Sequence, residues 1–329
     1  MRSRSGNRTA SGRGWWRRTR TALVVLCVVG LLLSAALVVV RLAGWDDGTS
    51  LALPMVLLPY AALTTVLALG VLLVLRSWWA VGLAGLLTLV QLIWLVPRFV
   101  PDGGSVAADA PRLRLATSNA YMGQVDVAAL VRLVREQRVD VLAVEELSGS
   151  AAAALDRAGI AELLPYRELP AGQDTALYSR LSLTPLAVSA SAQVAAEVSV
   201  GGRTVRLTAV HTYYPLGDAR RWSEDFDGLR AAAADSTRNA VFFGDFNATL
   251  DHAPMRDLLA TGLADTHAEL GRGGAPTWPE DNADFPFLPP VIQIDHVLHG
   301  DALSAVSVAE HTVPGADHRA VVAELAVTG

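Results

Sequence analysis

Residues 240–247 read AVFFGDFN, an apolar run that passes directly into glycine, aspartate and asparagine. The apolar residues 240–243 predict a β-strand, and the glycine after them predicts its end. Gly244, Asp245 and Asn247 are also common in ordinary turns. Carboxylate and amide groups at the end of a strand are, however, where α/β enzymes build their sites. This stretch therefore predicts both a strand and a candidate site.

The same arrangement recurs on both sides of this stretch. Further strands are predicted at Leu113–Thr117, Val139–Val144, Thr204–Val210, Ile294–Leu298 and Ala320–Leu325. Each of them borders polar groups, in chain order Ser118-Asn119, Glu145-Glu146, His211-Thr212, Asp295 and Asp317-His318. Any one of these groups alone reads as a turn or a cap. Six such groups in order along one domain are hard to obtain by chance.

Helical segments separate the predicted strands. Apolar residues in Asp126–Arg138 have the spacing of one helix face, and Leu229–Asp235 and Pro254–Thr261 are also predicted helices. This alternation indicates one α/β domain over residues 112–329. The Gly- and Pro-containing stretch 101–111 precedes it as a linker.

Residues 21–100 have a different character. Three long apolar stretches, Thr21–Gly44, Leu51–Leu75 and Ser77–Pro97, contain a single charged residue, Arg41. Each is long enough to cross a hydrocarbon core of ~30 Å at ~1.5 Å per residue, so three transmembrane helices are predicted.

The distribution of charge predicts an orientation for these helices. Seven arginines precede residue 21, which places the tail 1–20 in the cytoplasm. Asp46 and Asp47 lie in the first loop and Arg76 in the second turn, so the catalytic domain is expected outside the cytoplasm, on a multi-pass cell-membrane protein. A cleaved signal peptide at Ser34-Ala35-Ala36 is the alternative for the first stretch.

Two features of composition bear on function. Residues 101–329 carry 30 acidic residues and 17 arginines, so this part gains little from attraction to polyanions. Cys27 is the single cysteine, so no disulfide forms within the chain and compartment cannot be read from cysteines.

Taken together, the polar stretches resemble the endonuclease/exonuclease/phosphatase superfamily, as a membrane-anchored bacterial member. The matching stretches are Leu115–Asn119, Asp140–Leu147, Val210–Thr212, Gly244–Ala248, Thr277–Pro279, Ile294–Leu298 and Ala316–Arg319. The resemblance implies two packed mixed β-sheets flanked by helices, a four-layer sandwich. It also implies hydrolysis of a phosphoester with Mg²⁺, or with Mn²⁺ or Ca²⁺.

The resemblance also implies roles for single residues. Glu146 resembles the metal-binding glutamate, Asn119 the asparagine beside it, and Asp317 an acidic residue that orients the histidine or reaches the metal; these three are the candidate metal ligands that the resemblance implies. Asp245 and Asn247 match the pair that aligns the attacking water with the phosphate.

The remaining roles concern histidines and one carboxylate. His318 resembles the catalytic histidine, Asp295 a carboxylate near it, and His211 a histidine near the leaving group in some secreted nucleases. The other histidines, His252, His267, His296, His299 and His311, are expected to be structural.

Two positions depart from the family pattern. Glu145 stands where glutamine is usual, and Gln293 where arginine is common. Neither removes a predicted catalytic group, but both leave substrate preference open.

Three functions are compatible with the sequence. The first is a hydrolase of lipid head groups or small phosphodiesters beside the bilayer. Apolar residues in Gly271–Pro290 are suited to contact with lipid. The second is an extracellular nuclease, and the third a catalytically inactive scaffold or binding module. The lipid bilayer and a phosphoester substrate are the expected partners, and no obligate protein partner is evident.

Overall fold

The computed structural model describes residues 8–104, 106–188, 192–235, 237–280 and 285–329. The chain forms two compact units, one of residues 1–44 and 57–96, the other of residues 45–56 and 97–329. The first seven residues of the predicted cytoplasmic tail lie outside the described residues.

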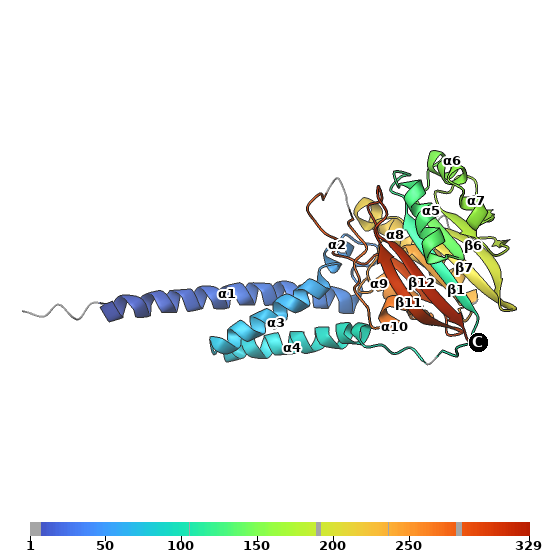
Figure 1. Cartoon of the computed structure of the whole chain (residues 1–329). Coiled ribbons are helices and arrows are strands. Elements are labelled where there is room, and N and C mark those ends of the chain that lie inside the picture. Colours follow the sequence, from blue (N-terminus) through green and yellow to red (C-terminus); the bar gives the residue numbers. More distant parts are fainter. Residues whose placement is uncertain (1–7, 105, 189–191, 236, 281–284) are drawn as a thin grey trace, which may run out of the picture. The chain divides into compact units, whose positions relative to one another are not determined.

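The first unit contains three apolar helices, α1 (Arg8–Ala43), α3 (Leu58–Val74) and α4 (Trp78–Leu95) (Figure 1). Small and aliphatic side chains pack between them, among them Leu31, Leu72 and Ala84. A buried polar cluster joins all three, because Ser34 Oγ lies 2.9 Å from Thr65 Oγ1 and accepts a hydrogen bond of 2.7 Å from Gln91 Nε2. Such bonds hold helices together in an apolar surrounding.

The prediction of three membrane spans holds only in part. Among the described residues, two helical stretches, Gly14–Ala43 and Trp78–Phe99, are long and apolar enough to cross a membrane by length and composition. The stretch predicted from Leu51 to Leu75 does not form one helix, since Leu51–Leu57 folds as turns around the short helix α2 (Ala52–Met55). The apolar helix that remains, Leu58–Val74, has 17 residues and is about 26 Å long, short of the full hydrocarbon thickness.

The second unit is an α/β sandwich. Its helices are α2, α5 (Val127–Gln137), α6 (Gly149–Arg157), α7 (Ile160–Leu163), α8 (Pro215–Asp235), α9 (Ala253–Leu259) and α10 (Thr266–Glu269). One sheet has the order β11 (Leu303–His311), β12 (Ala320–Val327), β1 (Arg112–Asn119), β2 (Val141–Glu145), β4 (Ala176–Ser179) and β3 (Tyr166–Glu168). The other has the order β5 (Thr184–Leu186), β6 (Gln193–Val200), β7 (Arg203–His211), β8 (Ala240–Asp245), β10 (Asp295–His299) and β9 (Ala264–Asp265).

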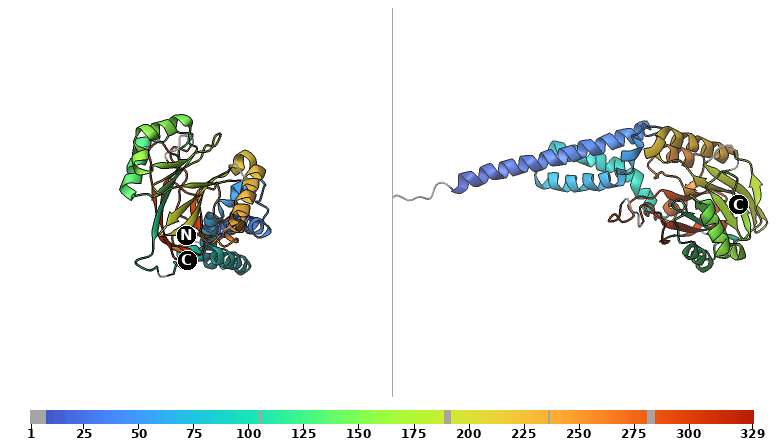
Figure 2. Two further views of the ribbon diagram at one scale, coloured as in Figure 1. Left: turned by 90° about the vertical axis from the view of Figure 1, so that its right-hand side faces the viewer. Right: turned by 90° about the horizontal axis from the view of Figure 1, so that it is seen from above.

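Three apolar clusters define four layers. Side chains of both sheets, such as Leu115 and Phe243, form the core between them. The outer face of the first sheet is covered by α5, α6 and α7, and that of the second by α8 and α9. Figure 2 shows the green helices and the gold α8 on opposite sides of the sheets. The predicted pair of packed mixed sheets flanked by helices is confirmed, since each sheet contains both parallel and antiparallel pairs.

Segments 45–56 and 97–111 belong to the same compact unit as the sandwich. Ala52 is fully buried and belongs to the same apolar cluster as Trp222 and Phe226, which α8 and α9 form with the second sheet. Segment 45–56, which contains the predicted loop and the first residues of the second apolar stretch, is therefore part of the sandwich unit.

Candidate active site

The predicted site residues come together because the strands that carry them are neighbours. In the second sheet, β8 pairs with β7 and β10, which places His211 and Asp295 directly beside Asp245. In the first sheet, β1 and β2 are parallel, and Asn119 pairs with Glu145, the residue before Glu146. Both groups lie at the same edge of the sandwich, since Asn119 Nδ2 donates to Asp245 Oδ2 at 3.1 Å.

The glycine of AVFFGDFN is required by the close approach of two strands. Gly244 has φ +147°, and a Cβ there would lie 2.0 Å from the carbonyl oxygen of Val210 on β7. Asn247 has φ +48° and Glu146 φ +51°, a region that side chains other than glycine rarely adopt. Strained backbone of this kind clusters at functional sites.

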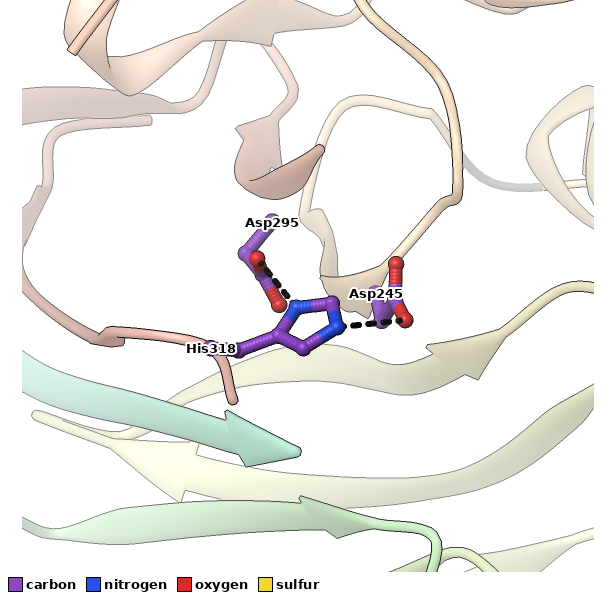
Figure 3. A group of neighbouring side chains, drawn as sticks. All are labelled: Asp245, Asp295 and His318. Atoms are coloured by element: carbon purple, nitrogen blue, oxygen red, sulfur yellow. Dashed lines mark hydrogen bonds and ion pairs between the residues drawn. The ribbon is translucent and has the colours of Figure 1, made fainter. Parts of the chain in front are cut away.

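His318 forms a buried pair with Asp295. Its Nδ1 lies 2.9 Å from Asp295 Oδ2, and its Nε2 points towards Asp245, with Oδ2 at 3.9 Å (Figure 3). Burial alone lowers the pKa of the imidazole, but the nearby carboxylates of Asp295 and Asp245 outweigh it and raise the pKa to about 10. His318 is therefore an imidazolium held in one orientation at neutral pH.

Asp245 faces this imidazolium. Burial raises the pKa of its carboxyl to about 6, the charge of His318 opposes that rise, and the charge of Asp295 adds to it. Asn247 holds the carboxylate in place, because its backbone N–H donates to Oδ1 at 2.8 Å and its Nδ2 to Oδ2 at 3.2 Å. A carboxylate with a pKa near neutrality is suited to accept a proton.

Asn119 connects this pair to Glu146. Its Nδ2 also donates to Glu146 Oε1 at 3.0 Å, and its Oδ1 accepts from the backbone N–H of Tyr121 at 2.9 Å. In this arrangement Asn119 orients two carboxylates and its amide oxygen is engaged elsewhere. Glu146 Oε2 accepts from the N–H of Met122 at 2.8 Å.

His211 forms a second histidine–carboxylate pair, which sequence reasoning missed. Its Nδ1 lies 3.3 Å from Asp174 Oδ1 and its Nε2 3.9 Å from Glu146 Oε1. Burial alone lowers its pKa, but the hydrogen bond to Asp174 and the charges of Asp245 and Glu146 raise it to about 9. Asp174 lies in a loop between β3 and β4 with no periodic pattern, so no signal in the sequence marks it.

The charge of this edge suits a divalent cation. Carboxylates of Glu146, Asp245, Asp295 and Asp317 face two imidazoles, and Asp295 Oδ1 is a buried oxygen without a hydrogen-bond partner among the described residues. Hard cations such as Mg²⁺ prefer oxygen ligands of this kind.

Glu146 and Asp317 are two of the ligands that the sequence predicts for such an ion. Burial raises the pKa of Asp317, and the charge of Glu146 adds to that rise, so the two carboxylates share one region. Atoms of Asp245, Asp295 and His318 also lie within 4.8 Å of one another. Because His318 Nδ1 already bonds Asp295 at 2.9 Å, we interpret these two residues as a histidine–carboxylate pair that faces Asp245.

The profile of the Endonuclease/Exonuclease/phosphatase family matches residues 116–318, more than half of the chain and every residue of this edge. The chain belongs to this family. Its characterised members are phosphoester hydrolases of the nuclease, phosphodiesterase and phosphatase classes.

Solved structures of the family share the fold. TDP2 of D. rerio, complexed with a single-strand DNA product, is 16% identical with a TM-score of 0.54, covering 65% of this chain and 98% of that one. A family protein from Beutenbergia cavernae is 18% identical with a TM-score of 0.52, covering 67% and 72%. TDP2 of Caenorhabditis elegans is 17% identical with a TM-score of 0.52, covering 68% and 77%. No curated protein matches the sequence.

Glu145, a departure from the family pattern, is buried behind the site. Its Oε1 accepts from Thr117 Oγ1 at 2.7 Å. Burial raises its pKa to about 8, and the charges of Asp295 and Asp245 act in the same direction against the hydrogen bond from Thr117. It is therefore a neutral acid at pH 7, which resembles the usual glutamine in charge.

The second departure, Gln293, lies in a buried polar network under the site. Its Nε2 lies 3.0 Å from His267 Nδ1 and 3.3 Å from His296 Nδ1. His296 also contacts Asp265 Oδ2 at 2.9 Å, and its Nε2 lies 2.9 Å from the carbonyl oxygen of Ala248. His299 and His252 are also buried and have partners, Glu269 and the carbonyl oxygen of Ala52. These contacts agree with the structural reading of the histidines.

A pocket of about 570 Å³ opens beside Glu146 and His211. Tyr213 and Tyr214 stack in it with ring centroids 4.8 Å apart, and the guanidinium of Arg221 lies 4.3 Å from the centroid of Tyr213. The wall also holds the carboxylates of Asp174 and Asp225. The pocket is therefore aromatic in part and acidic in balance.

Proposed function

We propose that the chain is a divalent-cation-dependent phosphodiesterase that acts on lipid head groups or small phosphodiesters at a membrane surface. The observation that carries this proposal is the single buried edge where Asp245 faces the Asp295–His318 pair and Asn119 links it to Glu146.

The side chains suit in-line hydrolysis of a diester. Asp245 accepts the proton of the attacking water, since its pKa of about 6 allows it to be a carboxylate at neutral pH. His318, fixed by Asp295, places a positive charge beside the phosphoryl oxygens. His211, protonated and held by Asp174, gives its proton to the leaving oxygen, so the products are a monoester and an alcohol.

A cation held by Glu146 and Asp317 would supply further positive charge to the phosphoryl group. The carboxylates around it would otherwise repel an anionic substrate. We therefore expect chelation to abolish turnover, although every acid–base residue stays in place.

Two observations favour a small or lipid diester over a nucleic acid. The pocket beside His211 carries Asp174 and Asp225 against Arg221 and the protonated His211, so these side chains supply no net positive charge for the next phosphate of a nucleic-acid strand. Phe287 is 97% exposed, and Phe285 and Leu288 beside it are also exposed.

These exposed side chains belong to the segment that borders the site. Glu280 N–H donates to the carbonyl oxygen of Asp317 at 2.7 Å, and Trp278 packs edge-on against Phe285. Residues 281–284 of the predicted lipid-facing stretch lie outside the described residues. An apolar tip beside a catalytic edge fits a lipid interface.

The same proposal includes a location for the protein in the cell membrane. We place the apolar helices in the cell membrane, with the arginine-rich tail in the cytoplasm and the catalytic unit outside, on the charge of residues 1–20 and of the first loop. The apolar tip and the site would then act on the outer surface. No protein partner is needed for this arrangement.

Assays of the purified full chain in detergent test the proposal. We expect Mg²⁺-dependent release from sphingomyelin, phosphoinositides or bis-p-nitrophenyl phosphate, and loss of it with EDTA. Faster cleavage of DNA or RNA than of any lipid diester would favour the nuclease alternative. Absence of metal-dependent release from all of these substrates would indicate an inactive scaffold.

A further inference from the structure

Three consecutive residues lie shortly after the turn 245–247, which carries Asp245 and Asn247. Asp251 and His252 directly precede α9, and Ala253 is its first residue. All three are buried. Each is bonded to a segment that adjoins the apolar helices in sequence, 45–56 or 97–111, and lies about 150 to 200 residues away along the chain. Two segments, 45–56 and 97–111, therefore hold residues 251–253 in place.

The loop between α1 and α3 makes two of these bonds. Ala253 N–H donates to Asp46 Oδ2 at 2.7 Å, and His252 Nε2 lies 3.0 Å from the carbonyl oxygen of Ala52. Asp46 and Ala52 are both fully buried. A carboxylate that accepts from the first N–H groups of a helix fixes where the helix begins.

The segment after α4 makes the third contact. Arg98 Nη1 donates to Asp251 Oδ2 at 3.0 Å, and Arg98 Nη2 to Oδ1 at 2.6 Å. This two-point fork fixes both position and orientation of the carboxylate. Asp251 is fully buried, so water does not compete for it.

The protonation of His252 agrees with its bonds. The backbone N–H of Thr249 donates to His252 Nδ1 at 2.8 Å, so Nδ1 carries no proton and Nε2 donates to Ala52. Burial lowers the pKa of His252, and the nearby backbone acceptor and the carboxylates oppose this, so the ring is neutral at pH 7.

The held stretch is tied to the catalytic turn. Trp222 packs edge-on against His252 at 5.3 Å, and its Nε1 donates to the carbonyl oxygen of Phe246 at 3.3 Å. Phe246 lies between Asp245 and Asn247, and Asn247 has φ +48°. A strained turn keeps its shape only when its surroundings fix it.

We propose that Asp46 and Arg98 are positioning residues for the catalytic turn 245–247, so that the loop 45–56 is needed for full turnover as well as for attachment. The assignment of Asp46 rests on its bond to Ala253, and that of Arg98 on its fork with Asp251. The claim about turnover rests on the proposed function, whereas the claim about the shape of the turn does not.

The test uses the full chain in detergent and three variants in the loop. Asp46→Ala removes the acceptor for Ala253, and Asp46→Asn keeps an oxygen at that place. Asp47→Ala removes the same charge one residue away, where the carboxylate accepts from Ser223 Oγ on α8; among the described residues it has no hydrogen bond to residues 251–253. Arg98→Lys is a fourth variant, outside the loop. It keeps the positive charge but loses the two-point hydrogen bond to Asp251.

Two readouts are measured well below the unfolding temperature. We expect Asp46→Ala to lower kcat on bis-p-nitrophenyl phosphate about tenfold with KM within about twofold, since a small misplacement of catalytic groups acts on kcat. Hydrogen exchange of the 245–253 amides should become faster in this variant. Asp46→Asn should recover most of both effects, Asp47→Ala should show neither, and Arg98→Lys should act in the direction of Asp46→Ala.

Different results would contradict the claim about turnover and the claim about the shape of the turn. A lower unfolding temperature with unchanged kcat per folded molecule and unchanged exchange in 245–253 would overturn the positioning role. If the wild-type chain has no metal-dependent turnover, the proposed function fails and hydrogen exchange alone decides whether Asp46 shapes the turn. If Asp46→Ala does not fold, the same two readouts on Arg98→Lys decide the question.

Discussion

The chemistry of the site depends on single carboxylates and imidazoles whose pKa values differ because their surroundings differ. Asp245 and His318 lie 3.9 Å apart, yet the pKa of the acid is about 6 and that of the imidazole about 10. A base and a fixed positive charge therefore coexist at neutral pH. This separation is the usual way in which neighbouring groups acquire different roles.

Removal of either group should affect turnover much more than folding. We expect Asp245→Ala or His318→Ala to lower kcat on an aryl phosphodiester by roughly two orders of magnitude or more, the scale of lost acid–base catalysis. Asp257→Ala, which removes an exposed carboxylate of α9, is the matched control. Near-normal turnover of folded Asp245→Ala would remove its assignment as the base.

The loss of rate caused by removing His211 should depend on the leaving group of the substrate. His211→Gln should slow a diester with an alkyl leaving group by about 100-fold or more, and one with p-nitrophenolate much less, because that anion leaves without a proton. Equal losses on both substrates would contradict the role of His211 as the acid.

The Asp174 partner gives this residue a pH signature. The raised pKa of His211, about 9, keeps the acid protonated up to that pH, so the rate on the alkyl substrate should fall only above it. Asp174→Asn removes a carboxylate that raises this pKa. The fall should then begin at lower pH in a rate profile, and an unmoved profile would exclude the pairing.

At the scale of elements, the helices are set by local signals that a sequence shows. Asp126 accepts from the N–H groups of Ala128 and Ala129 at 2.9 and 3.1 Å and so begins α5. We expect Asp126→Ala to cost about 1 kcal/mol, which lowers the unfolding midpoint by about 2–4 °C for a unit of this size. Asp109→Ala, an exposed acid before β1, should leave the midpoint unchanged.

Glu145 on β2 should make stability depend on pH. Its folded pKa of about 8 exceeds its value in the unfolded chain, so folding takes up a proton between about pH 4.5 and 8 and stability falls as the pH rises through that window. Glu145→Gln removes this pH-dependent contribution to stability. Melting curves in EDTA should show the variant gaining on the wild type from pH 5 to pH 8, and a constant difference would contradict a neutral Glu145.

The elements found from the sequence are those with a strong pattern of their own. The six strands that border polar groups, including β8, were predicted with bounds close to those observed, because a buried run next to Gly, Asn or a charge is a local signal. The strands β6 and β11 were not predicted. They are rich in alanine and serine, and their place is decided by pairing with β7 and β12.

The site was predicted in the same uneven way. Residues at strand ends, such as Glu146 and His318, stand out because the sheet brings such ends together. Asp174 did not, because its contact with His211 arises only when a loop folds over the site. Asn119 stays a predicted ligand, and no signal in the sequence showed that its oxygen accepts a hydrogen bond from the N–H of Tyr121.

At the scale of the whole molecule, the second unit is larger than the domain predicted from residue 112. Its fold includes the loop 45–56, which supplies a buried alanine to the core and a carboxylate to α9. The sequence hides this because Leu51–Leu57 is as apolar as a membrane helix. The chain therefore passes between the two units at three places, after residues 44, 56 and 96.

The most direct test of the account is a Mg²⁺ titration of turnover on bis-p-nitrophenyl phosphate by the full chain, with wild type compared with Glu146→Gln. We expect no turnover in EDTA, recovery with Mg²⁺, and a concentration for half-recovery at least about tenfold higher in the variant, since one carboxylate ligand is lost. Turnover that persists in EDTA, or equal titrations for the two proteins, would contradict a cation held by Glu146 at this edge.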